Sequence, residues 1–409
     1  MSRGIFALAA CMTLSAAFAA EPIPPGKGRL FLIGGAERTD NKPLWEAFVQ
    51  AVGGPGKKIA IFPTASRYPD NAAQERLEQF KALGLEPFAV PLSPLLKTPS
   101  HREVAYDEKW IDAVRNADAV FFGGGEQARI LFCLYNDDRE PTPLLKAVQE
   151  VYSRGGLLAG TSAGTAIMSR IMYRDAEFVL PTLLNGVTLG KEIDRGFGFL
   201  DERWIVDQHC LMKGRFARTL VPMRQHQVPF GIGIEEDTAV LFTGEEGLVV
   251  GRSNVIVLDA SHATTSPAEP RFNWTRLRLS LLGHGDRVNL KTAEVKPGAE
   301  KIAGRKVYPP PPNFEPLYFH KPFYNDILGT LVVQDAMIKL IDNPNHEAFG
   351  LAFDGRAARD AATPGFEFRF SRDERTAAWE NDLRGPIEYT ILNLQLDVRP
   401  ITIAGPLYK

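Results

Sequence analysis

The stretch Gly155-Gly156-Leu157-Leu158-Ala159-Gly160-Thr161-Ser162-Ala163-Gly164-Thr165-Ala166 joins a short apolar run to a serine between glycines. Residues 157–159 have the composition of a buried strand, and residues 166–172 carry apolar side chains at helical spacing. A Gly-x-Ser-x-Gly turn between a strand and a helix is typical of a nucleophile elbow, which exposes the serine hydroxyl. The pattern alone leaves a second interpretation open, in which a buried serine caps the next helix.

The chain before this turn alternates between strand-like and helix-like segments. We expect strands at residues 30–33, 58–62, 86–90 and 117–122, and helices at residues 44–52, 72–83 and 108–116. Strands that end in glycine- or serine-rich turns and alternate with helices predict an α/β fold, a parallel sheet with helices on both faces. Ligands bind such sheets at the carboxyl ends of the strands. The turns at residues 34–38, 64–67, 123–127 and 162 should therefore form the site.

The later part of the chain predicts further strands and a change of character. Strands are expected at residues 204–207, 231–234, 239–242, 247–250, 254–258 and 276–282. We expect a core domain over residues 28–290, a proline-rich linker over residues 291–312, and a small β-leaning C-terminal region over residues 313–409. In that region, strands are expected at residues 329–333, 366–370, 388–396 and 401–404.

Residues 1–20 predict a secretory signal peptide, because Arg3 precedes an apolar run that ends in small residues. We therefore expect a protein secreted to the periplasm or the exterior. An alternative is lipidation at Cys11, which follows a lipoprotein-like Leu-Ala-Ala. No later stretch is apolar and long enough to span a membrane. The formal net charge of −2 gives no electrostatic argument for nucleic-acid binding.

Two cysteines, Cys133 and Cys210, remain after the signal segment, and whether they pair is left open. The His, Cys and Asp residues show no metal-ligand spacing, so neither a metal nor a cofactor is expected. The sequence does not determine the oligomeric state, and a homodimer stays open.

A serine nucleophile needs a base and a group that orients the base. His209 is a good candidate for the base because it follows a predicted strand at its carboxyl end, although a half-buried structural histidine would look the same. The orienting acid could be Glu235, Glu236 or Asp237, which end another predicted strand. The resulting order of serine, histidine and acid differs from that of an α/β-hydrolase.

Together these motifs resemble the cyanophycinase family of serine peptidases, which is related to the bacterial α-aspartyl dipeptidases and has a fold like that of class I glutamine amidotransferases. The matching motifs are Gly34-Gly35-Ala36-Glu37, Phe121-Phe122-Gly123-Gly124-Gly125-Glu126-Gln127, the Ser162 turn, Asp207-Gln208-His209, and the segment 231–239. They follow the family's order and cover roughly residues 28–290.

The resemblance implies roles for residues of three kinds. It implies Ser162 as nucleophile, His209 as base and Glu236 as orienting acid, with Gly124, Gly125 and Ala163 as oxyanion-hole donors. The implied substrate-binding residues are Gln127, Asp207, Gln208, Lys213, Arg215 and Arg218. Lys213 stands where the family usually has arginine, which weakens a bidentate carboxylate contact there. Without the resemblance, the basic cluster at 213–218 would be interpreted as a solvated face.

The implied substrate is cyanophycin, a poly-aspartate backbone with arginine on each side chain. Arg215 and Arg218 would hold its carboxylates, and Asp207 or Glu126 its guanidinium groups. Attack by Ser162 would form an acyl-enzyme and release β-Asp-Arg dipeptides.

Three alternatives remain: an α-aspartyl dipeptidase, a general secreted esterase, and a non-catalytic binding protein on the same scaffold. The C-terminal region would bind the polymer granule or form an interface.

Overall fold

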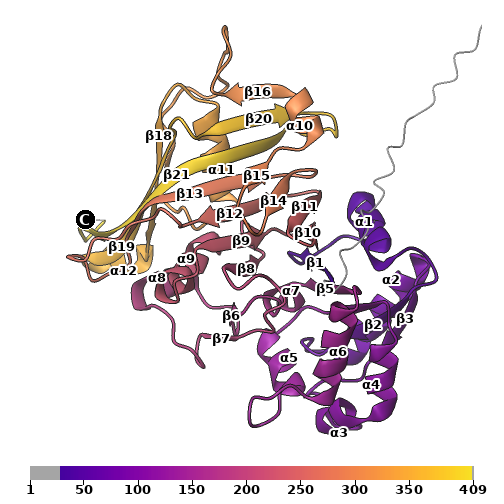
Figure 1. Ribbon diagram of the computed structural model, residues 1–409. Coiled ribbons are helices and arrows are strands. Elements are labelled where there is room, and N and C mark those ends of the chain that lie inside the picture. The colour runs from indigo at the N-terminus through magenta and orange to yellow at the C-terminus, as the bar shows by residue number, and fades with distance from the viewer. Residues whose placement is uncertain (1–27, 408–409) are drawn as a thin grey trace, which may run out of the picture.

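The computed structural model describes residues 28–407, so the expected signal segment and Cys11 lie outside the described residues. Two large sheets meet near the middle of the molecule (Figure 1). The expected parallel α/β sheet is confirmed in the first of them. Strands β1 (Arg29–Ile33), β2 (Lys58–Phe62), β3 (Glu86–Ala89), β4 (Ala119–Phe122) and β5 (Leu157–Thr161) pair in parallel in the order β3-β2-β4-β5-β1.

Helices cover both faces of this parallel sheet. One face of β1 carries Phe31 and Ile33, which pack in one core with α1 (Lys42–Val52) and α2 (Pro69–Ala82). The other face carries Leu30 and Leu32, in a second core with α3 (His101–Tyr106), α4 (Glu108–Arg115), α5 (Gln127–Leu134) and α6 (Pro143–Ser153). Because both faces of β1, β2, β4 and β5 are buried, the residues inside these strands are apolar and do not alternate with polar residues.

Antiparallel strands extend the first sheet beyond β1. They are β10 (Thr238–Thr243), β11 (Glu246–Gly251), β14 (Arg287–Asn289) and β15 (Val295–Lys296). The second sheet begins with β8 (Trp204–Gln208), β9 (Phe230–Ile234), β12 (Val255–Asp259) and β13 (Trp274–Leu282). The strands expected between residues 204 and 282 are thus present, distributed over both sheets.

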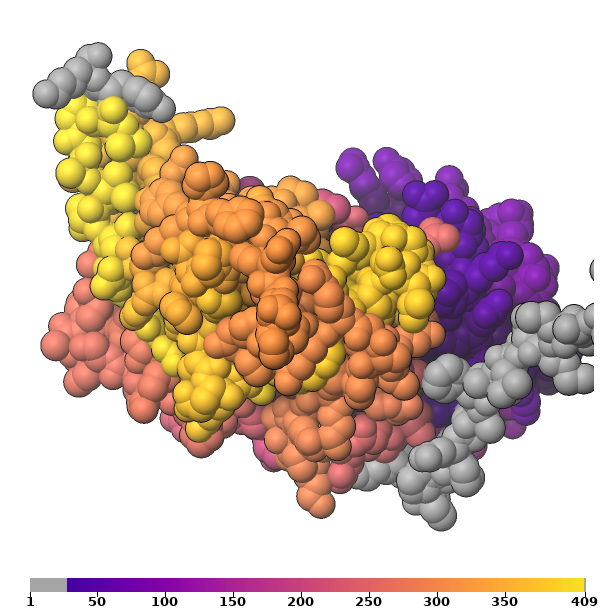
Figure 2. Space-filling model, turned by 90° about the horizontal axis from the view of Figure 1, so that it is seen from above, coloured from indigo at the N-terminus to yellow at the C-terminus, as the bar shows by residue number. Residues whose placement is uncertain are grey.

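The C-terminal residues complete the second sheet. Strand β21 (Glu388–Ile403) pairs with β13 on one side, and on the other with β19 (Thr363–Ser371) and β20 (Ala377–Asn381). Strands β18 (Glu347–Phe353), β17 (Phe323–Tyr324) and β16 (Arg305–Tyr308) follow outward from these. Seen from above, the orange and yellow residues of this region lie at one end of the molecule and the indigo residues at the other (Figure 2). The boundaries expected at 290 and 313 therefore do not coincide with a break in the sheet.

Three local expectations are wrong. The helix expected to 172 ends early: α7 spans Ala163–Ala166, and Ile171–Tyr173 form β6, which pairs with β7 (Ile193–Arg195). Ser169 Oγ donates to the carbonyls of Ala166 and Ile171, and such side-chain bonds compete with helix continuation. Residues 291–312, expected as a linker, hold β15, α10 (Ala299–Ala303) and β16.

The strand expected at 329–333 is the third. Instead, the helix α11 (Val332–Ile341) begins there, and Val333, Ala336, Met337 and Leu340 on one face are buried. This i, i+3, i+4, i+7 spacing is that of an amphipathic helix. Helices α8 (Val179–Asn185), α9 (Phe216–Gln225) and α12 (Gly355–Asp360) complete the second half.

Both remaining cysteines are free and buried, so Cys133 and Cys210 do not pair. Among residues 28–407, no helix combines the length and apolar character needed to cross a membrane.

A buried polar cluster fastens β21 to the loop that follows β13. The Asp286 carboxylate accepts hydrogen bonds from Thr390 Oγ1 (2.5 Å) and from the Gly283 and Gly298 amides (both 2.7 Å). Nearby, the fully buried Lys301 donates to Glu388 Oε2 at 2.6 Å. Burial raises the pKa of Asp286 to about 6 and lowers that of His284 to about 4.

These two shifts predict opposite pH dependences. His284 has a folded pKa below its ordinary 6.5, so its contribution to stability is lost as pH falls. Asp286 has a folded pKa above its ordinary 3.8, so its contribution is lost as pH rises. As the pH falls from 7 to 4.5, the free energy of unfolding of His284→Gln should rise by about 2 kcal/mol relative to that of wild type. The free energy of unfolding of Asp286→Asn should fall by about as much relative to wild type. Urea unfolding at both pH values measures this; equal trends in the two variants would contradict it.

Candidate active site

Three successive carbonyls at the end of β1 hold the segments that form the site. The Ile33 carbonyl accepts from the Ser162 amide (3.1 Å), that of Gly34 from the His209 amide (3.0 Å), and that of Gly35 from the Asp237 amide (2.9 Å). The Gly34 amide donates in turn to Thr238 O at 2.9 Å.

Both glycines are required by this close approach. A Cβ on Gly34 would lie 2.0 Å from the Glu235 carbonyl oxygen. One on Gly35 would lie 2.4 Å from the His209 ring, and Gly35 also has a φ of +108°. The turn expected at residues 34–38 therefore brings the predicted site residues together.

Ser162 lies at the apex of a sharp turn between β5 and α7. Its backbone has φ 52° and ψ −111°, an uncommon conformation for a residue with a side chain. The flanking glycines allow the chain to pass close to itself: a Cβ on Gly160 would lie 2.0 Å from Gly164 O, and one on Gly164 would lie 2.1 Å from Phe122 O. The expected elbow is therefore present, and Ser162 caps α7 without a side-chain hydrogen bond to it.

The side chains of Ser162, His209 and Glu236 form a continuous chain of hydrogen bonds. His209 Nε2 lies 3.0 Å from Ser162 Oγ, and His209 Nδ1 lies 2.7 Å from Glu236 Oε1. Burial lowers the pKa of His209, with Lys213 and Arg215 acting in the same direction and the Glu236 hydrogen bond opposing them. The imidazole is thereby kept neutral to lower pH, and a neutral imidazole can accept a proton from the serine.

The three acidic residues that could orient His209 have different partners in the structure. Glu235 is buried and points the other way, where its Oε2 accepts from the Leu211 and Met212 amides at 2.5 and 2.8 Å. The Asp237 carboxylate accepts from Asn41 Nδ2 at 2.8 Å. Of these three, Glu236 is the one that contacts His209.

One buried ion pair beside the serine was not predicted. Glu37 accepts from Thr161 Oγ1 at 2.6 Å and pairs with Arg76 at 2.7 Å, and its side chain is 4% exposed. The Arg76 guanidinium lies 4.8 Å from the centre of the Phe121 ring. This pair fixes the residue that precedes Ser162. Glu37 was visible as part of a motif, but its partner lies on α2, which no sequence pattern connects to it.

The glycine-rich turn after β4 lies against Ser162. A Cβ on Gly124 would be 3.3 Å from Ser162 Cβ, and one on Gly125 would be 2.0 Å from Ala65 O. Ala163 is the first residue of α7, so its amide has no acceptor within the helix. Backbone N–H groups of this turn and of α7 are thus near the serine hydroxyl.

The expected substrate-binding residues fall into two groups. Gln208 Oε1 lies 3.4 Å from Ser162 Oγ and accepts from Arg215 Nη1 at 2.9 Å. Lys213 is exposed and, like Arg215, borders a cavity. These three residues lie at or beside the site.

The second group, Asp207, Arg218 and Gln127, is buried behind the site. Arg218 donates to both oxygens of Asp207 at 2.7 and 2.8 Å, and neither residue is more than 2% exposed. Gln127 Nε2 donates to Tyr173 O at 2.7 Å. Asp207 and Arg218 are therefore buried and paired with each other, and their direct contact with a substrate stays a prediction.

Glu126, the other residue expected to bind a guanidinium group of the substrate, also has an ion-pair partner within the protein. Glu126 pairs with Arg129 at 2.7 Å, so its carboxylate has a cation already. In residues 28–407, no group of three or more His, Cys, Asp or Glu side chains is arranged to hold a metal ion.

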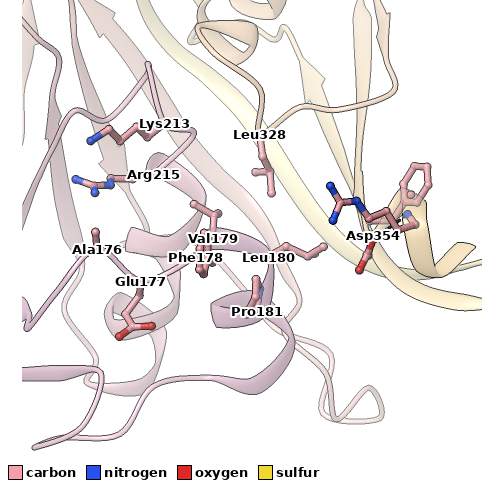
Figure 3. A pocket seen from close by; sticks show the side chains of 13 residues that line it. Ala176, Glu177, Phe178, Val179, Leu180, Pro181, Lys213, Arg215, Leu328 and Asp354 are labelled. Carbon is pink, nitrogen blue, oxygen red and sulfur yellow. Dashed lines mark hydrogen bonds between the residues drawn. The ribbon is translucent and has the colours of Figure 1, made fainter.

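A cavity of about 1020 Å³ extends from Lys213 and Arg215 (Figure 3). Its other lining residues are Ala176, Glu177, Phe178, Val179, Leu180, Pro181, Leu328, Phe353, Asp354, Gly355 and Arg356. The cavity is therefore bordered on one side by residues that follow His209, and on another by the C-terminal region. Its cationic end is connected to Ser162 through Gln208.

An α/β fold with serine, histidine and glutamate side chains in hydrogen-bond contact at the strand ends is typical of hydrolases that use a serine nucleophile. Comparison with known proteins is more specific. Residues 30–250 match the model of Peptidase family S51. A protein named cyanophycinase from Geminocystis herdmanii is 30% identical over 288 residues, covering 66% of this chain and 97% of the relative. One with the same name from Synechococcus elongatus is 29% identical, covering 66% of this chain and 81% of the relative.

The chain therefore belongs to Peptidase family S51 and is a peptidase of this serine-type family. Among solved structures, a peptidase from an acI-B1 actinobacterium is similar, with a TM-score of 0.47 and 23% identity, covering 64% of this chain and 97% of that one. The family match ends at residue 250, so the C-terminal wall of the cavity lies outside it.

The Gly35–His209 contact predicts a large effect of a single methyl group. Gly35→Ala should slow the modification of Ser162 by a fluorophosphonate roughly 100-fold, because the new Cβ displaces the His209 ring. Gly54→Ala is the matched control: Gly54 also has a positive φ (+98°), but a Cβ there meets nothing within 4 Å. Equal labelling rates for the two variants would contradict the prediction.

Proposed function

We propose that this peptidase hydrolyses cyanophycin through Ser162, His209 and Glu236, and releases β-Asp-Arg dipeptides from the chain. The observation that carries the proposal is the chain of hydrogen bonds from Ser162 Oγ to His209 and on to Glu236. The substrate is supported by the relatives named cyanophycinase.

In the proposed reaction, His209 Nε2 takes the proton of Ser162 as its Oγ attacks the scissile carbonyl carbon. Glu236 accepts the Nδ1–H bond, which selects the tautomer that has a free Nε2 and stabilises the imidazolium that forms. The carbonyl oxygen becomes an oxyanion, for which the amides of Gly124, Gly125 and Ala163 are the proposed donors. The imidazolium then gives its proton to the leaving amine. Water, deprotonated by the same histidine, then attacks the acyl carbon. The bond from that carbon to Ser162 Oγ breaks, and His209 returns the proton to Oγ as the acid leaves.

The binding side of the proposal rests on the residues that border the cavity. Arg215 and Lys213 supply positive charge close to Ser162, suited to the arginine carboxylate of each polymer unit. Gln208 contacts both Arg215 and Ser162, so it can align the bound unit with the nucleophile. Asp207, Arg218 and Gln127 support this wall from behind.

Export is the remaining part of the proposal. The signal-like sequence at residues 1–20 supports a secreted enzyme that degrades polymer released by other cells. N-terminal sequencing of the protein recovered from culture medium would test it; recovery only from the cytoplasm with Met1 in place would reject it.

Loss of the nucleophile should abolish clearing of a cyanophycin suspension. We expect Ser162→Ala to lower kcat roughly 10⁴-fold or more and Glu236→Gln roughly 10³-fold, because the first removes the attacking atom and the second the acceptor that fixes the tautomer. Turbidity measures the rate, and mass spectrometry identifies the products. Ser153→Ala, at an exposed serine on α6, is the matched control.

A folded wild type that clears nothing would reject cyanophycin as substrate. Aspartyl dipeptides would then be assayed, and failure there would favour a non-catalytic binding protein. Clearing by Ser162→Ala would place the chemistry elsewhere.

The acid limb of the pH profile should depend on Lys213. This cation lowers the pKa of His209, and only the neutral imidazole acts as base. Lys213→Met should therefore raise that pKa and move the acid limb of kcat/KM to higher pH. Lys81→Met, at an exposed lysine on α2, should leave the limb in place. An unchanged limb in Lys213→Met would contradict the assigned base.

A further inference from the structure

The cavity continues well beyond the residues that serve the proposed reaction. Its cationic end lies next to Gln208, whereas Leu328 and Asp354 stand on the opposite side (Figure 3). Phe353 and Arg356, the sequence neighbours of Asp354, also line the cavity, and these four residues are called the C-terminal wall. Its volume of about 1020 Å³ is at the upper end of the range for pockets that hold one small molecule. A single dipeptide unit bound at Ser162 therefore gives the C-terminal wall no ligand to contact.

Hydrogen bonds on both sides hold the wall in position. The Leu331 amide donates to Leu211 O at 3.0 Å, two residues after His209. Asp354 caps α12 by accepting from the amides of Arg356 and Ala357 at 2.8 and 3.2 Å. On the opposite side, the buried Arg218 donates to Glu177 O at 2.9 Å. The wall is therefore held by contacts within the protein itself, and such preorganisation lowers the entropic cost of binding.

The side chains that line the cavity are complementary to a chain that carries both positive and negative charges. Positive side chains come from both parts of the lining, Lys213 and Arg215 from the segment after His209 and Arg356 from the C-terminal region. Glu177 and Asp354 supply negative charge, and Phe178, which is 78% exposed, lies with Val179 and Leu180 between them. Carboxylates, guanidinium groups and methylene chains each find a complementary surface here.

Resting on the proposed function, we propose that the C-terminal wall is a subsite for polymer units next to the unit being cut. Arg356 binds the carboxylate of such a unit, while Phe178 and Phe353 pack on its aliphatic carbons. The C-terminal region thus makes this peptidase select longer chains over short fragments.

The test compares defined oligomers of two and four β-Asp-Arg units. Wild type should show a higher kcat/KM for four units than for two. Arg356→Ala should lower this ratio about fivefold, since an exposed ion pair is lost, and Arg356→Glu should lower it further by repulsion. Arg359→Ala is the matched control, because Arg359 is an exposed arginine on the same helix that does not border the cavity.

The outcomes separate the two proposals. Cleavage of both oligomers by wild type with equal kcat/KM overturns the subsite and leaves the proposed function intact. The subsite is also overturned if Arg356→Ala and Arg359→Ala show the same ratio of kcat/KM for four units to kcat/KM for two. Cleavage of neither oligomer by wild type rejects the proposed function, and the subsite with it.

Discussion

The site depends on the backbone at the end of β1. Successive carbonyls of Ile33, Gly34 and Gly35 accept the amides of Ser162, His209 and Asp237. Ser162 follows a strand of the first sheet, His209 follows a strand of the second, and Glu236 lies where the chain passes from the second sheet back to the first. This turn therefore joins the two sheets, and its backbone hydrogen bonds fix the relative positions of Ser162, His209 and Glu236. Any side chain larger than hydrogen at residue 34 or 35 would break this arrangement.

A second layer of buried polar groups positions the cavity wall. Arg218 pairs with Asp207, and its guanidinium lies 4.2 Å from the centre of the Tyr173 ring, whose hydroxyl donates to Arg218 O. Gln127 bonds the carbonyl of the same tyrosine. A buried pair of this kind gives little net stability, because desolvation offsets the attraction. Its effect is geometric: it holds the strand end that carries Gln208 against the segment that carries Glu177.

Sequence patterns predicted the parallel sheet and the candidate residues because both leave local signals. Apolar strands before glycine turns mark the sheet edge, and the Ser162 elbow, His209 and the acidic trio each end a strand. The choice of Glu236 over Glu235 rested on the resemblance, since neighbouring carboxylates differ only in where the backbone points them. The mutual neutralisation of Asp207 and Arg218 was missed because their pairing depends on how α9 packs on β8. The role of Leu328 and Phe353 was missed because they lie far along the chain from Ser162.

The pairing of β21 with β13 has a consequence for folding. These strands are separated by more than a hundred residues, yet each covers an edge of the other at the centre of the second sheet. Contacts between such distant segments form slowly, because a long loop must close first. Until β21 arrives, β13 presents an open edge of unpaired amides and carbonyls, which invites pairing with another chain. The enzyme's second half is therefore most vulnerable to aggregation in the interval between emergence of β13 and docking of β21.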